Sequence, residues 1–210
     1  MNRNVLVFGA TGKTGSHICK VLESKTISYS VFVREGSQDK LANKSVNIQY
    51  GDVLNAQDVK NAFKDSVFTD VIIALGSKEL KSTDIRSRGT KHIIDAMGAS
   101  QSEARIHVIS ALGIGDSWNQ LVWHAKLISN LLIKSSMIDH GKQEEYVKNS
   151  SFSYHILRPV GLKDGQATGN VKVQNEGFPS SSSIQRADVA NFLVDGLLEN
   201  KTGISAICQG

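Results

Sequence analysis

Short apolar runs alternate with amphipathic segments along most of the chain. The run Asn4 to Phe8 is apolar at its last four residues, as expected for a strand that is buried on both faces. Residues 13–24 follow, and their apolar positions, such as Ile18 and Leu22, recur with helical spacing. A strand followed by a helix, repeated along a chain, is typical of the βαβ units that build a parallel sheet.

The same alternation continues beyond the first unit. Further strands are predicted at residues 29–33, 46–50, 70–75, 106–110 and 153–157, with two short ones at 171–174 and 204–207. Helices are predicted at residues 55–64, 84–97 and 187–198, and one long helix or two stacked ones over 127–148. This order predicts an α/β protein with a single Rossmann-type, doubly wound parallel sheet and helices on both faces. We expect one domain over residues 1–210, with substrate-side loops at 76–83, 111–123 and 159–183.

Composition narrows the class of protein without changing this picture. The 210 residues are 40% hydrophobic and 21% charged, and the net charge of +4 comes from scattered lysines and arginines, so we expect a globular protein without a nucleic-acid partner. No apolar run approaches the roughly 20 residues needed to span a bilayer, and the first one is too short for a secretory leader. Cys19 and Cys208 lack the spacing of a metal or disulfide site. A cytoplasmic protein without membrane association or a metal is expected.

A glycine-rich turn directly after the first strand carries the clearest chemical signal. Residues 9–15 read GATGKTG and open the first predicted helix. In such a turn the glycines permit a tight bend, close approach of the backbone to a diphosphate, and close packing of helix on strand. The spacing differs from that of an ATPase phosphate loop. The residues expected to contact a dinucleotide here are Gly9, Thr11, Gly12, Lys13, Thr14 and Gly15.

Arg34 indicates which dinucleotide is bound. It follows the second predicted strand, about where an acidic residue would hold the ribose 2′-hydroxyl of NAD. A guanidinium offers forked donors to phosphate oxygens, whereas a carboxylate would repel them. Adjacent Glu35 weakens the argument, but Arg34 favours NADP as the cofactor, and Lys13 could add a second positive charge on the phosphates.

Several motifs occur along this chain in the same order as in a known family. They are GATGKTG at 9–15, VFVR at 31–34, GDV at 51–53, ALGS at 74–77, the strand end at Ser110 and LRP at 157–159. Together they resemble the atypical short-chain dehydrogenase/reductases, within them the NAD(P)H-binding group that includes NmrA-like proteins and the flavin reductase also called biliverdin-IXβ reductase. The resemblance implies that Asp52 and Val53 flank the adenine and that Leu75, Gly76 and Ser77 line the ribose and diphosphate side. It also implies that Pro159 to Leu162, with Pro159 and Val160 as the named contacts, lie near the nicotinamide.

Two residues are candidates for the reaction itself. Ser110 ends a strand that should be central, so its hydroxyl would point into the crevice where ligands bind, and the resemblance implies that it polarises the substrate or contacts the nicotinamide. Lys142 is similar to the helical lysine that bonds the nicotinamide ribose in the family. The family's usual tyrosine, four residues earlier, is replaced by Ile138, which puts the usual proton relay to a carbonyl in doubt.

The function that fits these residues best is transfer of a hydride from NADPH to a small, flat acceptor of the flavin or quinone type. Such acceptors place little demand on a protein acid, and the protein would supply binding and orientation. One alternative is an NmrA-like regulator that binds NADP(H) without turnover and acts on a protein partner. A sugar-nucleotide epimerase or dehydratase is less favoured, because such enzymes usually have the tyrosine and a larger carboxyl-terminal substrate region.

Overall fold

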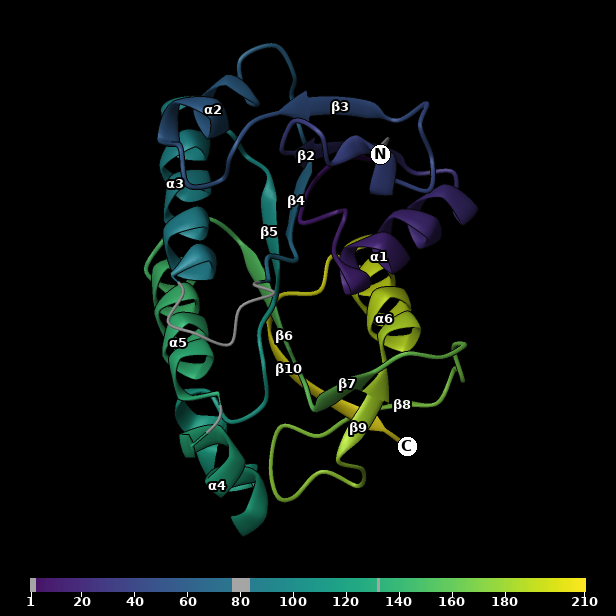
Figure 1. Ribbon diagram of the computed structural model, residues 1–210, viewed down its shortest axis with the longest axis vertical. Helices are drawn as coiled ribbons and strands as arrows, with labels where there is room; N and C mark the ends of the chain where they lie inside the picture. The colour runs from purple at the N-terminus through teal and green to yellow at the C-terminus, as the bar shows by residue number, and fades with distance from the viewer. Residues whose placement is uncertain (1–2, 77–83, 132) are drawn as a thin grey trace.

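The computed structural model describes residues 3–76, 84–131 and 133–210, and its centre is an eight-stranded sheet (Figure 1). In spatial order the strands are β3 (Asn47–Tyr50), β2 (Ser28–Val33), β1 (Asn4–Phe8), β4 (Asp70–Ile73), β5 (Arg105–Ile109), β6 (Tyr154–Pro159), β10 (Gly203–Gln209) and β8 (Val171–Val173). All neighbours pair in parallel except β8, which runs antiparallel to β10. This is the doubly wound arrangement expected from the sequence.

Helices cover both faces of the sheet (Figure 1). They are α1 (Lys13–Ser24), α2 (Ala56–Asn61), α3 (Ile85–Ala99), α4 (Trp123–Leu131), α5 (Lys134–Lys148) and α6 (Arg186–Leu198). Buried residues of α1 and α6 form one core with one face of the sheet, and those of α2, α3 and α5 form the second core on the other face. Residues of β1 alternate between the cores, so this strand is buried on both sides. Its unbroken apolar run is explained by this position.

The sheet order places a topological switch point between β1 and β4. From β1 the chain moves outward to β2 and β3, and it then returns to the other side of β1 to form β4 and β5. The connections that leave β1 and β4 therefore diverge, which opens a crevice at the carboxyl ends of these two strands. Ligands of doubly wound sheets bind in this crevice.

Two short parallel strands, β7 (Gly161–Lys163) and β9 (Ser183–Gln185), form a separate small sheet that the apolar pattern does not predict. The predicted stretch 127–148 is resolved into α4 and α5, and α4 begins earlier, at Trp123. Loops 111–123 and 159–183 lie together, since Gln120 donates a hydrogen bond to the Asn175 carbonyl. Most of the third expected substrate-side loop, residues 77–83, lies outside the described residues. No helix in the described part of the chain is long and apolar enough to cross a membrane.

Candidate functional site

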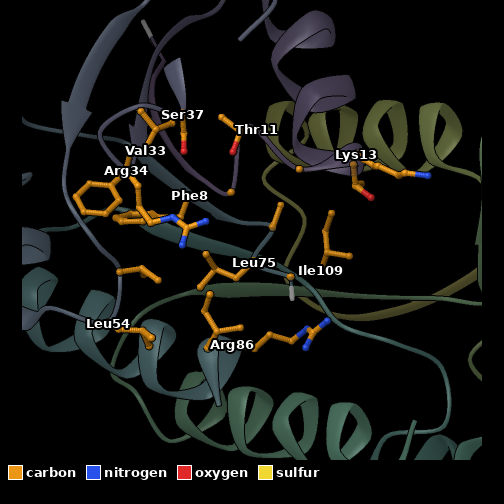
Figure 2. A pocket seen from close by; sticks show the side chains of 18 of the residues that line it. Phe8, Thr11, Lys13, Val33, Arg34, Ser37, Leu54, Leu75, Arg86 and Ile109 are labelled. Atoms are coloured by element: carbon orange, nitrogen blue, oxygen red, sulfur yellow. The ribbon is translucent and has the colours of Figure 1, made fainter. Parts of the chain in front are cut away.

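A cavity of about 990 Å³ lies at the switch point (Figure 2). Its lining comes from the segments that follow β1, β2, β3, β4 and β5, together with the start of α3, His140 of α5, Leu162 of β7 and Arg186 of α6. Of the residues expected to form the site, the following line this cavity: Gly9, Thr11, Gly12, Lys13, Thr14, Arg34, Asp52, Val53, Leu75, Gly76 and Ser110. Ser77 lies outside the described residues.

The glycine turn has the geometry that its sequence predicts. Gly9 has φ of +87°, and a Cβ there would overlap the Ala74 carbonyl at the end of β4. A Cβ on Gly15 would overlap the Gly9 carbonyl, so this glycine allows α1 to pack on the turn. Gly12 is the N-cap of α1, and no side chain among the described residues caps the helix. The first N–H groups of α1 therefore face the cavity without protein acceptors, which favours an anion there.

Positively charged groups mark one end of the cavity. Arg34 and Lys40 are exposed and line it, and Ser37 lies between them in the chain. Neither cation has an ion-pair partner among the described residues. Figure 2 shows Arg34, Ser37 and Thr11 at the same end of the cavity. Two unpaired cations beside a hydroxyl are suited to bind a phosphate.

Backbone contacts hold the edge of the cavity between β3 and α2. One carboxylate oxygen of Asp52 accepts the Leu54 N–H at 2.9 Å, and the Asp52 N–H donates to Asp58 at 2.9 Å. The ring of His92 on α3 is hydrogen-bonded to the Val53 carbonyl at 2.9 Å. Gly89, also on α3, leaves room for Val53 and Leu75, because a Cβ there would lie 2.8 Å from each side chain. The expected adenine-side residues are thus held from two helices, Asp52 by α2 and Val53 by α3.

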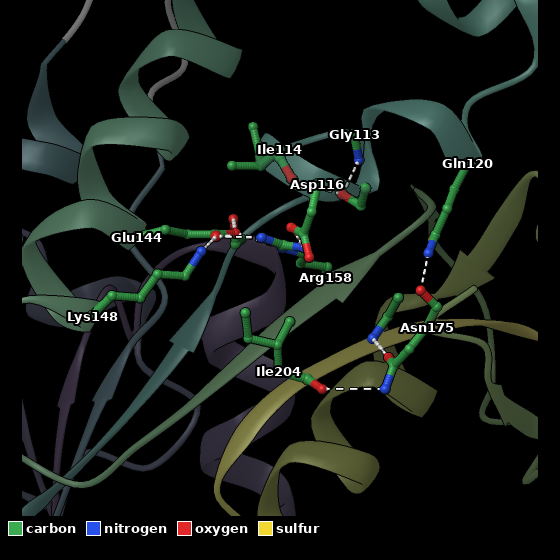
Figure 3. Close-up of polar contacts among 12 residues, drawn as sticks. Gly113, Ile114, Asp116, Gln120, Glu144, Lys148, Arg158, Asn175 and Ile204 are labelled. Carbon is green, nitrogen blue, oxygen red and sulfur yellow. Dashed lines mark hydrogen bonds and ion pairs between the residues drawn. The ribbon is translucent and has the colours of Figure 1, made fainter. Parts of the chain in front are cut away.

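Ser110 is hydrogen-bonded to a largely buried ionic network, and Figure 3 shows its members Glu144, Arg158, Lys148 and Asp116. Its Oγ donates to Glu144 Oε1 at 2.7 Å. The Glu144 carboxylate also accepts from Nε and Nη2 of Arg158, at 2.9 and 2.7 Å, and from Lys148 at 2.8 Å. The remaining Arg158 nitrogen donates to Asp116 at 2.7 Å. Burial alone would raise the pKa of Glu144, but these hydrogen bonds outweigh it and lower the pKa below its usual value.

The ionised state of Glu144 determines what Ser110 can offer a ligand. A serine hydroxyl has one proton and two lone pairs. Because the proton is donated to a carboxylate, the hydroxyl presents acceptor capacity to the cavity.

His140, one helical turn before Glu144 on α5, also lines the cavity. Burial, followed by the charge of Arg86, lowers its pKa to about 4. The ring is therefore neutral at pH 7. Gln143 donates its amide N–H to Thr90 Oγ1 at 3.0 Å, which leaves its amide oxygen 3.3 Å from His140 Nδ1. An amide oxygen only accepts, so Nδ1 carries the proton and Nε2 is an acceptor.

Comparison with known proteins agrees with this geometry. Residues 9–200 match the model of the NAD(P)H-binding family. The chain belongs to this family. An uncharacterized chloroplastic protein of Arabidopsis thaliana is 29% identical over 212 residues, covering 98% of this chain and 75% of that protein.

Solved structures share the fold of this NAD(P)H-binding protein. The anaerobillin reductase ChuY of Escherichia coli O157:H7 superposes with a TM-score of 0.80 at 24% identity, covering 98% of this chain and 97% of that one. A short-chain dehydrogenase/reductase of Veillonella parvula in complex with NADP superposes with a TM-score of 0.81 at 14% identity, covering 100% and 95%. The family match confirms the resemblance to the NAD(P)H-binding group, and the solved structures confirm the Rossmann-type fold.

Lys142 does not occupy the place expected for it. It is exposed and lies outside the cavity lining, whereas His140 lines the cavity. Successive helical residues rotate by about 100°, so positions 140 and 142 face nearly opposite directions. The structure therefore does not bring Lys142 to the cavity, and the residue of α5 that lines it is His140.

Four other expected contacts also differ from the structure, and the first is Gly15, which lets α1 pack on the turn but does not line the cavity. Pro159 and Val160 do not line the cavity, and Val160 is buried in the core shared by α1 and α6; Leu162 is the lining residue of this segment. Lys13 lines the cavity, but its ammonium group forms a 2.8 Å ion pair with Asp164, which also binds Arg186 at 2.6 Å.

Sequence reasoning missed Arg86 and the partners of Ser110. Arg86 lines the cavity from the start of α3, and Glu144 and Arg158 are nearly inaccessible to solvent. A buried Glu–Arg pair separated by fourteen residues has no local sequence pattern.

Proposed function

We propose that this protein is an NADPH-dependent reductase that transfers a hydride to a flat, conjugated acceptor of the flavin or quinone type. The observation that carries the proposal is the pairing, within one cavity, of the uncapped start of α1 with the unpaired cations Arg34 and Lys40. A diphosphate and a 2′-phosphate are the anions that NADPH would bring to these two places.

The residues of the cavity fit this cofactor along its length. The N–H groups of the α1 start would bind the diphosphate, and Arg34, with Lys40 and Ser37, would bind the 2′-phosphate. Asp52 and Val53 would flank the adenine, and Leu75 and Gly76 would line the ribose side. The bound cofactor would supply the hydride. The protein would supply binding and orientation.

The protonation of Ser110 and His140 favours one class of hydride acceptor. The Ser110 proton is donated to Glu144, and the proton of neutral His140 is on the nitrogen that faces Gln143. Both groups therefore offer acceptors to the cavity. A hydride acceptor that spreads the added charge over its own conjugated system and takes a proton from water needs no proton donor from the protein. A simple carbonyl needs a group that gives up a proton to its oxygen, and Arg86, which also lines the cavity, cannot do so because a guanidinium keeps its proton.

The test is a panel of acceptors in steady-state assays that follow the loss of reduced nicotinamide. We expect NADPH to be oxidised faster with flavins and quinones than with aldehydes, and NADPH to be used in preference to NADH. Binding of NADPH without oxidation by any acceptor would contradict the enzyme and favour the dinucleotide-sensing regulator with a protein partner. Preference for aldehydes would contradict the acceptor class.

A further inference from the structure

Arg86 brings a largely buried positive charge to the Ser110 end of the cavity. Its side chain is 12% exposed and lines the cavity together with Ile109, Ser110 and His140. Figure 2 shows the guanidinium extending toward the Ile109 end, away from Arg34. If the phosphates of the cofactor lie at the Arg34 end and along α1, this position borders the space left for the acceptor.

Protein acceptors satisfy only some of the N–H groups of this guanidinium. Asp139 of α5 accepts the backbone N–H groups of Arg86 and Ser87, at 3.1 and 2.9 Å, and thereby caps the start of α3. The same carboxylate is 3.4 Å from Nη1 of Arg86. Nε and Nη2 have no acceptor among the described residues, and Nε is screened from solvent. Arg86 is therefore held in place by Asp139 but retains hydrogen-bonding capacity.

The surroundings leave the N–H groups of Arg86 incompletely satisfied. Most of the hydrogen-bonding capacity of Asp139 is used by the α3 backbone. Glu144 is bound by Arg158 and Lys148, and Asp84, which also lines the cavity, is exposed and pairs with Arg88 at 3.4 Å. The neighbouring His140 is neutral. A negatively charged ligand group would supply the missing acceptor, and a carboxylate matches the planar fork of arginine.

We propose that Arg86 is a specificity-determining residue that selects flat acceptors bearing a carboxylate, which its guanidinium would bind at the Ser110 end of the cavity. This inference rests on the proposed function, since it names the acceptor class of the same site. A neutral hydride acceptor would leave the buried guanidinium without an anionic hydrogen-bond partner. An unsatisfied buried guanidinium carries a desolvation penalty.

The experiment compares two flat ligands that differ in one group. Binding of 2-naphthoate and 2-naphthamide to the protein saturated with NADP⁺ is measured by calorimetry. The wild-type protein should bind the carboxylate roughly 10- to 100-fold more tightly, the range of a charge-assisted hydrogen bond. Arg86→Gln should abolish this preference while leaving naphthamide affinity unchanged. Arg88→Gln, on the exposed face of the same helix, should keep the wild-type preference.

Arg86→Lys is the second variant, because it retains the charge near Asp139 if the glutamine variant unfolds. It should prefer naphthoate, though less strongly than the wild-type protein. Equal binding of the two ligands by wild type, binding of neither, or an equal loss of both in Arg86→Gln would overturn the inference. A loss of NADP⁺ affinity with the naphthoate preference intact would assign Arg86 to the cofactor instead. Failure of the proposed function appears separately, as absence of NADP⁺ binding or of NADPH oxidation.

Discussion

At the scale of single residues, Arg34 carries the preference for the phosphorylated cofactor. Arg34→Ala should weaken NADPH binding by about 1.5–3 kcal/mol, the contribution of a hydrogen bond to a charged group, and leave NADH binding nearly unchanged. Fluorescence titration of both cofactors measures this difference. Lys44→Ala is the matched control, because Lys44 is exposed on the same connection but does not line the cavity. An equal loss for both cofactors would exclude a role at the 2′-phosphate.

A substitution at Ser110 tests whether its hydroxyl donates its proton to Glu144 or to the substrate. Because its hydroxyl donates to Glu144, Ser110→Ala removes an acceptor from the cavity and should slow flavin and aldehyde reduction alike, by no more than about tenfold. Single-turnover oxidation of NADPH at saturating cofactor separates this effect from binding. A selective loss of ~10² to 10⁴ with the aldehyde would instead identify Ser110 as a donor to the substrate oxygen.

Residue roles could be predicted from sequence where a backbone motif dictates them. The glycines of the first turn have their roles because only glycine leaves room for Ala74 and for the backbone of the turn itself. The structure does not bring Lys142 to the cavity, because sequence spacing names a residue type but not the direction in which the helix presents it. Arg86 could not be found, since its place in the cavity depends on how α3 packs on α5.

At the scale of secondary-structure elements, a substitution in the turn between β1 and α1 should weaken cofactor binding without preventing folding. Gly12 has φ of −78°, which any residue can adopt, and a Cβ there would meet only the Gly9 carbonyl, at 3.2 Å. Gly12→Val should therefore fold, but its side chain would occupy the approach to the α1 N–H groups. We expect NADPH affinity to fall by at least about 100-fold, the loss of one to two charge-assisted bonds.

The control for this variant is Gly98→Val on α3, where a Cβ has nothing within 4 Å. It should bind NADPH like the wild-type protein. Binding by titration and folding by circular dichroism are measured on both variants. Normal NADPH binding by a folded Gly12→Val protein would refute the assignment of this turn to the diphosphate.

Long periodic elements were predicted better than short ones. Residues 13–24 form α1 as expected, because one apolar face of this helix is buried in the core that it shares with α6. The strands β7 and β9 have three residues each, too few to show a period, and they pair through tertiary contacts. The break between α4 and α5 falls within a continuous apolar stripe, so periodicity alone could not locate it.

At the scale of the whole molecule, buried histidines make stability depend on pH. Burial lowers the pKa of His140 and His155 to about 4, and it also lowers the pKa of His107. The unfolded chain binds protons at its histidines near pH 6.5, before the folded protein does. The free energy of unfolding should therefore be fully retained above about pH 6.5 and decrease as the pH falls toward about 4.

Urea denaturation at about pH 7.5 and about pH 5 measures this dependence. His155→Gln, which cannot titrate, should reduce the difference in unfolding free energy between the two conditions. His124→Gln should leave it unchanged, because His124 is exposed. The lowered pKa values of Asp70 and Glu144 affect stability only at lower pH, so they do not interfere. An unchanged pH dependence in His155→Gln would contradict the account.

The most direct test of the central claim is a single turnover of the protein with bound NADPH. The complex is mixed with excess riboflavin without oxygen, and the loss of reduced nicotinamide is followed for NADPH and for NADPH deuterated at the transferred position. The account predicts oxidation that is much faster than in the absence of protein and slower with deuterium. Tight binding of NADPH with no oxidation above the protein-free rate, with riboflavin and with a quinone, would contradict it.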